Sequence, residues 1–318
     1  MNDELNDSYD VVVAGGGAAG LSGALMLVRS KRRVAVIDAG APRNAPADGV
    51  HGFLSRDGIS PAELLERGRA DVRRYGGHVV AGEIAAAARD DDGFALTLAD
   101  GRAVRARRLL VATGAADQLP GIPGLRARWG KDVVHCPYCH GWEVRDRPIG
   151  VLAGGPFAGH QALLFRQLSD DVTLLAHTSA PLADEEAERL AARGIKIVPG
   201  EVTRLEVTGD RLTGVRLSDG TVVALEALAV GPRLAVRAGF LAGLGLHPVE
   251  HPSGAGQYLP ADPAGRSAVP GVWVAGNVTD PSAQVVAAAA AGAVAGAQIN
   301  FDLVSEETSQ AVAGVRVP

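Results

Sequence analysis

The first forty residues contain the pattern that most restricts the fold. The segment "YDVVVAGGGAAGLSGALMLVRSKRRVAVIDAG" predicts an apolar strand, a glycine-rich turn, a helix to about Ser30 and a second apolar strand that ends at Asp38. Gly15, Gly17 and Gly20 have the G-x-G-x-x-G spacing, which permits a tight turn, close approach to a pyrophosphate and packing of helix on strand. The acid at the end of the second strand suits a ribose hydroxyl. We therefore expect a dinucleotide-binding unit at this end of the chain.

A second unit of the same kind begins near residue 148. The segment "RPIGVLAGGPFAGHQALLFRQLSDDVTLLAH" again predicts strand, turn, helix and strand, although its turn aligns as G-x-G-x-x-A with an alanine, Ala153, at the first position. Alternating apolar residues predict further strands over 94–98, 103–112, 202–207, 212–217 and 222–230. We therefore expect an α/β fold with two Rossmann-like three-layer domains.

Three further segments complete the expected organisation. "TGAADQLPGIPG" (113–124) predicts a Pro/Gly-rich linker between the two units. "AVPGVWVAGNVTD" predicts a buried strand ending at Gly276-Asn277, followed by an Ala-rich helix from about Pro281. The last residues, 305–318, have no apolar periodicity and predict a frayed tail.

Composition excludes several classes of partner. A net charge of −5 without a basic run argues against nucleic acid and against an anionic membrane surface. The uncharged run 11–28 is interrupted by glycines and reads as buried strand, turn and helix, and the run 281–299 is too rich in alanine to insert into a membrane. No export signal is visible, so we expect a cytoplasmic protein.

The two cysteines of the chain lie in "VVHCPYCHGWEV" (133–144), as Cys136 and Cys139 with His135 and His140 beside them. A zinc site needs four ligands, and this short loop cannot wrap around one ion without a second CxxC elsewhere. A C-x-x-C-H haem attachment normally requires export, and a glutaredoxin-like CPYC belongs near the start of a small fold. We therefore favour a redox-active dithiol, and no metal.

Together these markers resemble the low-molecular-weight thioredoxin reductase family of flavoproteins. The resemblance rests on "VVVAGGGAAG", on "LLVATGA" (109–115), on the CxxC of the second unit and on "GVWVAGNVTD". It implies an FAD domain made from both ends of the chain (1–116 and 243–304), an inserted pyridine-nucleotide-type domain that carries the dithiol (117–242), a tail (305–318) and a homodimer.

The resemblance also implies the residues that hold FAD. Asn277 stands where the family usually has an aspartate that binds the ribityl chain, and an amide can also bond a hydroxyl. His51 lies near the flavin, lines the substrate pocket or has a structural role. The full expected set, which runs from the pyrophosphate and adenosine to the flavin edge, is Gly15, Gly17, Ala18, Gly20, Asp38, Arg43, Asn44, His51, Ala112, Thr113, Gly114, Gly276, Asn277, Gln284 and Val285.

By position in the family, Cys139 is the sulfur next to the flavin and Cys136 the outer sulfur that meets the substrate. Thioredoxin reductases have an acidic residue after the second cysteine, where this chain has His140. A histidine can take a proton from an incoming thiol and stabilise the thiolate. We therefore expect His140, and less strongly His135, to take part in catalysis.

The source of the electrons separates two branches of the family. The basic cluster that would bind the 2′-phosphate of NADPH is absent after the second unit, where His177 is the one candidate. "CPYCHGWE" and "HGFLSRDG" look like the FAD-dependent dithiol oxidases, which close disulfides in natural products such as gliotoxin and holomycin. This implies a small-molecule dithiol as substrate, and dioxygen as acceptor giving hydrogen peroxide. The alternatives are a thioredoxin reductase fed by NADPH or ferredoxin, and a non-enzymatic flavin redox sensor.

Overall fold

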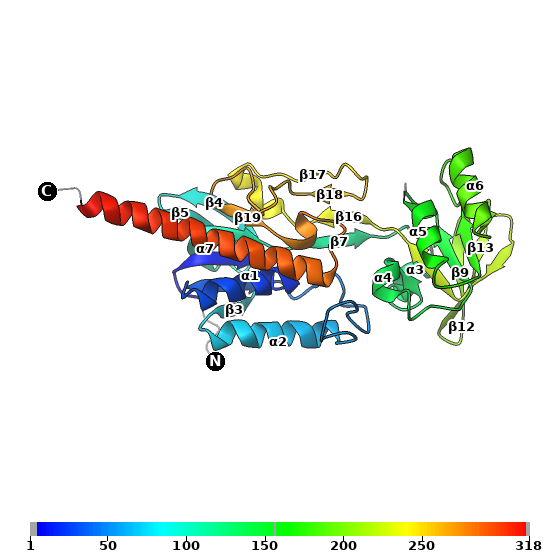
Figure 1. Ribbon diagram of the computed structural model, residues 1–318, viewed down its shortest axis with the longest axis horizontal. Coiled ribbons are helices and arrows are strands. Elements are labelled where there is room, and N and C mark those ends of the chain that lie inside the picture. Colours follow the sequence, from blue (N-terminus) through cyan, green and yellow to red (C-terminus); the bar gives the residue numbers. More distant parts are fainter. Residues whose placement is uncertain (1–4, 156, 316–318) are drawn as a thin grey trace.

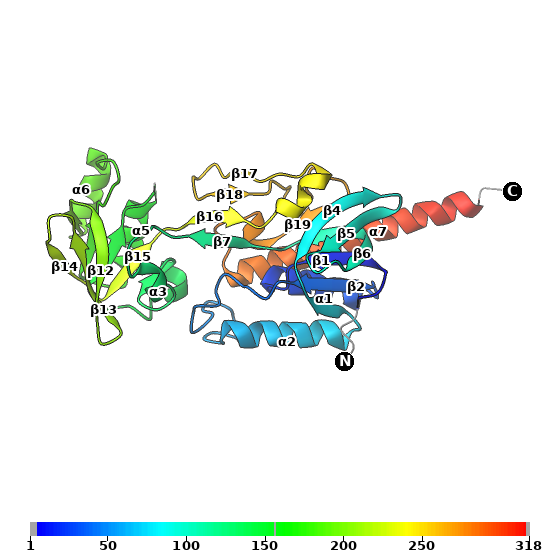
Figure 2. The same cartoon turned by 180° about the vertical axis from the view of Figure 1, so that it is seen from behind.

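Two lobes joined by a two-stranded ribbon make up the fold of the computed structural model, which describes residues 5–155 and 157–315 (Figure 1, Figure 2). The large lobe contains both ends of the chain, and the small lobe is inserted between them. This arrangement confirms the expected α/β fold with two Rossmann-like domains, of which the first is discontinuous.

A parallel sheet forms the centre of the large lobe. Its order is β3-β2-β1-β6, and the other edge of β6 pairs first with the antiparallel hairpin β5-β4 and then with β19. The strands are β1 (Ser8–Ala14), β2 (Val34–Asp38), β3 (His78–Ala81), β4 (Ile84–Asp90), β5 (Gly93–Leu98), β6 (Ala103–Val111) and β19 (Val272–Val274).

Alternate residues of these strands enter two different cores. Val11 and Val13 pack under α1 (Ala18–Arg29), α2 (Pro61–Arg74) and α7 (Val285–Val315), whereas Val12 faces the core that contains Phe94. The second core is completed by η1 (Gly239–Leu244) and lies near the hairpin of β17 (Val249–Glu250) and β18 (Gln257–Tyr258). The large lobe therefore has three layers, and the carboxyl ends of its strands point toward the small lobe.

The small lobe repeats this plan at smaller size. Its parallel sheet has the order β11-β10-β9-β15-β8, and a three-stranded antiparallel sheet, β12-β13-β14, packs beside it. The strands are β8 (Val133–Val134), β9 (Ile149–Leu152), β10 (Val172–Leu175), β11 (Lys196–Val198), β12 (Val202–Thr208), β13 (Arg211–Leu217), β14 (Val222–Ala224) and β15 (Ala227–Val230). The helices are α3 (Leu125–Arg128), α4 (Pro137–His140), α5 (Ala158–Phe165) and α6 (Asp184–Ala192).

Two predicted segments differ from the structure. The run 222–230 is split, because β14 ends the antiparallel sheet and β15 enters the parallel one. The predicted linker 113–124 contains β7 (Ala115–Gln118), which pairs with β16 (Arg233–Val236) to form the ribbon between the lobes.

The Ala-rich helix α7 is also longer than predicted, because residues 305–315 continue it instead of fraying. By length and composition α7 could cross a membrane, with a mean hydropathy of 1.3 over its most apolar window. Its glycines instead pack directly on α1: a Cβ at Gly292 would collide with the carbonyl of Ala19, and one at Gly296 with that of Gly23. We interpret α7 as a surface helix of the large lobe, lying along α1 (Figure 1).

We propose a domain division that follows this packing. The chain first passes from the large lobe to the small lobe, as expected, between residues 116 and 117, within β7. The core of the large lobe includes Ala238, Phe240 and Leu241. We therefore propose that the chain returns to the large lobe at Arg237 instead of between residues 242 and 243. Of the predicted tail, residues 316–318 lie outside the described part of the chain.

Candidate active site

A cavity of about 720 Å³ lies where the two lobes meet. It is lined by the glycine-rich turn after β1, by the loop after β2, by the end of β6, by the start of α7 and by the dithiol segment. The predicted residues that line it are Gly15, Gly17, Ala18, Asp38, Arg43, Asn44, His51, Ala112, Thr113, Gly114, His135, Cys136, Cys139, His140, Gly276, Asn277, Gln284 and Val285. The structure therefore brings the expected cofactor residues and the dithiol to one place.

The glycine-rich turn has the geometry that its spacing predicts. Gly15 has a φ of +104°, and a side chain there would collide with the carbonyl of Ala112. Gly20 does not line the cavity, because it packs on the carbonyl of Gly15 and lets α1 approach the strand. Gly17 precedes the first turn of α1, and no described atom lies within 4 Å of the position of its missing Cβ. The open face of the turn and the free N–H groups of the helix suit a pyrophosphate.

Two polar side chains further along the cavity support the fit to FAD. Asp38 ends β2 and accepts hydrogen bonds from the N–H of Gly40 (3.1 Å) and from Arg69 of α2 (3.0 Å), which leaves lone pairs for a ribose hydroxyl. Within the described residues, the buried Oγ1 of Thr113 has no hydrogen-bond partner. A buried hydroxyl is normally bonded, so a ligand atom in this cavity would satisfy it.

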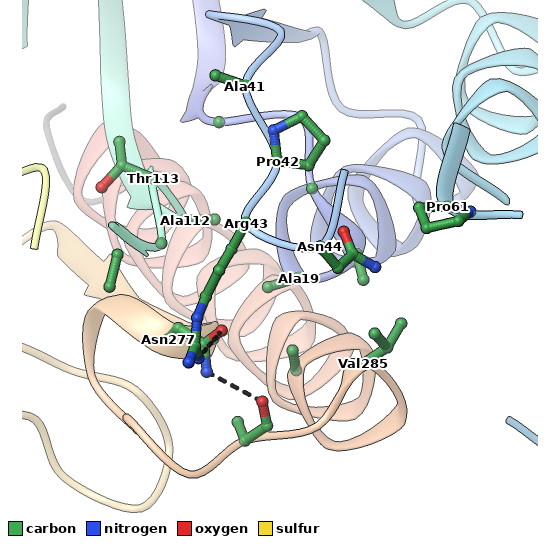
Figure 3. Close-up of a pocket in the computed structure, with 18 of the residues that line it drawn as sticks. Ala19, Ala41, Pro42, Arg43, Asn44, Pro61, Ala112, Thr113, Asn277 and Val285 are labelled. Carbon is green, nitrogen blue, oxygen red and sulfur yellow. Dashed lines mark hydrogen bonds between the residues drawn. The ribbon is translucent and has the colours of Figure 1, made fainter. Parts of the chain in front are cut away.

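Asn277, which we expect at the ribityl chain, is held in place by hydrogen bonds of its own amide group. Its Nδ2 donates to the carbonyls of Asp280 (3.0 Å) and Ala283 (2.9 Å), so both of its protons are used inside the protein. The Arg43 side chain reaches toward its Oδ1, at 3.5 Å (Figure 3). Asn277 therefore has only an acceptor left for a cofactor hydroxyl.

The dithiol segment presents three faces, because residues 136–144 follow helical turns. Cys136, Cys139 and His140 line the cavity, and Glu143 continues this face one turn later. On the second face, Gly141 and Val144 pack into the small lobe. The third face carries Tyr138 and Trp142, whose side chains are exposed to solvent. The CxxCHGWE spacing thus directs both sulfurs and His140 toward the large lobe.

The two thiols differ sharply in acidity. Cys136 lies at the start of α4, and a hydrogen bond from the Cys139 thiol is the main cause that lowers the pKa of Cys136 to about 7. The N–H groups of Cys139 and Tyr138 and the charge of Arg43 act in the same direction. The same thiol contact and burial raise the pKa of Cys139. Cys136 is therefore the sulfur that ionises, as expected for the outer position.

The two histidines have different surroundings. Burial, Arg43 and His140 lower the pKa of His135 to about 4. Burial also lowers the pKa of His140, while Glu143 opposes this shift. In the part of the chain that the structure describes, neither ring nitrogen of His140 has a hydrogen-bond partner. A neutral imidazole with free nitrogens beside the sulfurs can accept a proton.

Two contacts hold the lobes together around the cavity. Nε2 of His51 lies 3.4 Å from Glu143 Oε1 on the dithiol segment, and its Nδ1 lies 3.5 Å from Asp57. Gly130 of the small lobe lies directly against the carbonyl of Pro46. His51 therefore contributes to the interface between the lobes, a structural role that we had considered, while it also lines the cavity.

Several residues of the site carried no signal in the sequence. Asp117 and Arg237 line the cavity from the ribbon and its end, and Arg69 reaches Asp38 from α2. Each depends on the packing of segments that are distant along the chain, and the motifs alone do not reveal them.

Two side chains of the second nucleotide-type unit lie where a nucleotide phosphate would have to be accommodated. The carboxylate of Glu186 on α6 lies where a Cβ of Gly159 would be, in the first turn of α5. Nδ1 of His177 accepts the N–H of Val202 at 3.0 Å, so this candidate phosphate contact is used within the lobe. Pro156, within the glycine-rich turn, lies outside the described residues. An acid at the start of this helix disfavours a phosphate.

Comparison with known proteins gives matches over nearly the whole chain. Residues 9–293 match the family described as pyridine nucleotide-disulphide oxidoreductase. Thioredoxin reductase sirT of Leptosphaeria maculans is 32% identical, over 92% of this chain and 94% of the fungal protein. Thioredoxin reductase tcpT of Claviceps purpurea is also 32% identical, over 95% of this chain and 96% of that protein. The crystal structure of HlmI is 46% identical with a TM-score of 0.90, covering 98% of this chain and 97% of its own.

Proposed function

The chain belongs to the pyridine nucleotide-disulphide oxidoreductase family, and we propose that within it the protein is an FAD-dependent dithiol oxidase. It is a flavin-dependent thiol/disulfide oxidoreductase, with FAD as its cofactor. The finer proposal is that it forms a disulfide in a small-molecule dithiol and passes the electrons to dioxygen. The observation that carries it is the shared cavity, in which an acidic thiol and a histidine without a hydrogen-bond partner among the described residues face the cofactor residues.

The first steps use only residues of the chain. His140 takes the proton of one substrate thiol, and the resulting thiolate attacks Sγ of Cys136 in the Cys136–Cys139 disulfide. The S–S bond breaks, and Cys139 leaves as a thiolate that is protonated from His140. His140, neutral again, then takes the proton of the second substrate thiol, and the resulting thiolate attacks the substrate sulfur of the mixed disulfide. The proton passes from His140 to Cys136 when that sulfur leaves. Cys136 leaves readily because the pKa of its thiol is low.

The balance of these steps is one cyclic or linear disulfide product and one enzyme dithiol. When bound, FAD supplies the two-electron oxidation that restores the Cys136–Cys139 disulfide, and dioxygen then accepts the electron pair and two protons as hydrogen peroxide. We assign proton transfer to His140 and not to His135, because the low pKa of His135 makes it a weak base. Asp38, Thr113 and the Gly15–Gly17 turn would hold the cofactor.

A thioredoxin reductase is the second candidate, because the similar fungal proteins carry that name. It would need a nicotinamide nucleotide or another donor, such as ferredoxin. Glu186 and His177 argue against a nucleotide phosphate on the small lobe.

We also propose that the protein is a homodimer and that it is cytoplasmic. Light scattering of the purified protein checks the oligomeric state.

Anaerobic mixing tests the direction of electron flow. We expect dithiothreitol to bleach the flavin absorbance of the purified protein within the time of mixing experiments, and NADPH to leave it unchanged. Admission of air should restore the absorbance and give one hydrogen peroxide per disulfide. Rapid bleaching by NADPH would instead support the reductase.

Single cysteine variants test the route through the couple. Cys136→Ser and Cys139→Ser should each lower oxygen consumption with dithiothreitol by about 10²-fold or more, because a serine cannot form the disulfide. Flavin absorbance serves as the control for folding. Oxygen consumption by Cys136→Ser at the wild-type rate would contradict the proposed relay, and a wild type that consumes none would favour a redox sensor.

A further inference from the structure

Arg43 lies where three distant segments meet at the cavity. It belongs to the loop between β2 and α2, and its Nε donates to Oδ1 of Asp117 on the interlobe ribbon at 2.8 Å. One of its terminal nitrogens lies 3.5 Å from Oδ1 of Asn277 (Figure 3). The side chains of Arg43 and Asp117 are only 20% and 10% exposed. Arg43 lines the cavity with the other expected cofactor residues, and its guanidinium also reaches the ribbon.

Both partners of Arg43 are themselves held in place. The amide nitrogen of Asn277 donates to the carbonyls of Asp280 and Ala283, which turns its oxygen toward Arg43. An aspartate at this position could not donate to these carbonyls. Asp117 sits opposite Leu234 in the ladder of the ribbon. The guanidinium is therefore fixed from two sides by groups with little freedom.

The charge of Arg43 acts on the dithiol. Arg43, Cys136 and Cys139 line the same cavity. The positive charge acts to lower the pKa of both thiols, as the smallest of the causes at each, and it adds to the effect of burial on His135. An arginine stays charged at every pH of interest. Its partial burial weakens the screening by solvent that would cancel such an effect at the surface.

We propose that Arg43 is a positioning residue of the redox site: anchored by Asp117 and Asn277, it keeps a positive charge in the cavity that the Cys136–Cys139 pair lines and so favours a thiolate at Cys136. The inference rests on the proposed role of this couple. Asp117 belongs to the ribbon that joins the lobes. Its contact with Arg43 therefore holds the guanidinium at the cavity in the same arrangement of the lobes that places the dithiol there.

The variants used in the test leave the other titratable groups around the dithiol unchanged. The thiol of Cys139 donates a hydrogen bond to Cys136, and His135 directly precedes Cys136 in the chain. From the large lobe, His51 and Asp48 face His140 together with Glu143 of the dithiol segment. None of these residues is changed in the variants below.

The experiment is the pH dependence of alkylation of Cys136 by iodoacetamide in the dithiol-reduced holoenzyme, followed by peptide mass spectrometry under anaerobic conditions. In Arg43→Gln the midpoint should rise, so that the rate at pH 7 falls by up to about 10-fold, the factor that corresponds to one pKa unit. Arg43→Lys should retain most of the wild-type rate. Arg233→Gln is the matched control and should keep the wild-type midpoint, because Arg233 lies on the same ribbon but pairs with Glu250 (2.6 Å) away from the cavity lining.

Asp117→Leu, which removes both the acceptor oxygens and the negative charge, separates anchoring from simple charge. If Asp117 acts by holding Arg43, its loss should raise the midpoint, whereas loss of its own negative charge alone would lower it. This variant also decides the matter if Arg43→Gln does not fold. Wild-type midpoints in Arg43→Gln, or a lowered midpoint in Asp117→Leu, would overturn the proposal. The readout needs no turnover, so it is independent of whether dioxygen is the acceptor.

Discussion

Cys136 and Cys139 have opposite tendencies to ionise, although only two residues separate them. The hydrogen bond from the Cys139 thiol stabilises a thiolate at Cys136, and the same contact makes ionisation of Cys139 unfavourable. Since two thiolates side by side would repel, the pair carries at most one negative charge, which forms as pH rises through about 7. One sulfur is then a nucleophile and a good leaving group, while the other keeps the proton.

This asymmetry predicts the effect of removing the second thiol. With a pKa of about 7 for Cys136, alkylation of the reduced protein should rise as pH increases through 7, since only the thiolate reacts. Cys139→Ala removes the donor and should move the midpoint up, toward the value of about 8.5 for a free thiol. Cys139→Ser keeps an O–H donor and should shift it less. An unchanged midpoint in Cys139→Ala would show that the thiol contact is not the main cause.

The chemistry of these residues could be predicted, but their support could not. The CxxC spacing and His140 identify a redox couple because sulfur and imidazole chemistry depend on residue type and short spacing. Arg43 and Asp117 act through one contact between two loops, and neither the fingerprint nor the CxxC contains information about that contact.

At the scale of elements, the contact of α1 with α7 depends on three glycines. The two helix backbones touch at Gly23, Gly292 and Gly296. A Cβ added at Gly296 would lie only 2.6 Å from the carbonyl oxygen of Gly23. Both helices cover the same face of the sheet, and α1 directly follows the glycine-rich turn after β1. Their close packing therefore sets the position of the turn and of the start of α7 at the cavity.

Substitution within α7 tests this packing. Gly296→Val should lower the free energy of unfolding by about 1–3 kcal/mol, as is typical of overpacking, because the backbone of α1 cannot move aside without disturbing the turn. Gly314→Ala in the same helix is the control, since no described atom lies within 4 Å of the added carbon. It should leave stability unchanged or raise it. The midpoint of urea denaturation measures both, and equal midpoints for the two variants would contradict the role of the contact.

Elements defined by their own pattern were predicted correctly, and those defined by distant partners were not. The strand-turn-helix-strand units at β1-α1-β2 and β9-α5-β10 follow from apolar runs and glycines. The end of α7 has no apolar period. It is held by ion pairs to the large lobe, among them Arg108 with Asp302 (2.6 Å) and Arg107 with Glu307 (2.7 Å). The ribbon pairs β7 with β16, and these two strands lie far apart in the sequence. The pattern of β7 alone therefore predicted a linker and not a strand.

For the whole molecule, the position of one lobe against the other decides whether the dithiol meets the cofactor cavity. Sequence patterns predicted two lobes, but they contain no information about this position, because it depends on a few contacts across the cavity. These are the contact of His51 with Glu143 and the close approach of Gly130 to Pro46. The second is backbone against backbone, so it tolerates no added atom.

Gly130→Ala should therefore keep the lobes from reaching this arrangement. Gly130 has a φ of +84°, and its Cβ would lie 2.6 Å from the carbonyl oxygen of Pro46. Because misplacement by about 1 Å can slow a reaction by about 10²-fold, anaerobic bleaching of the flavin by dithiothreitol should slow by about 10-fold to 100-fold. Flavin content should not change. Gly220→Ala is matched in backbone strain, with a φ of +89°, but its Cβ would have no described atom within 4 Å. If both variants bleach at the same rate, strain and not lobe contact explains any loss; if only Gly130→Ala is slow, the approach of the lobes controls electron transfer from the dithiol.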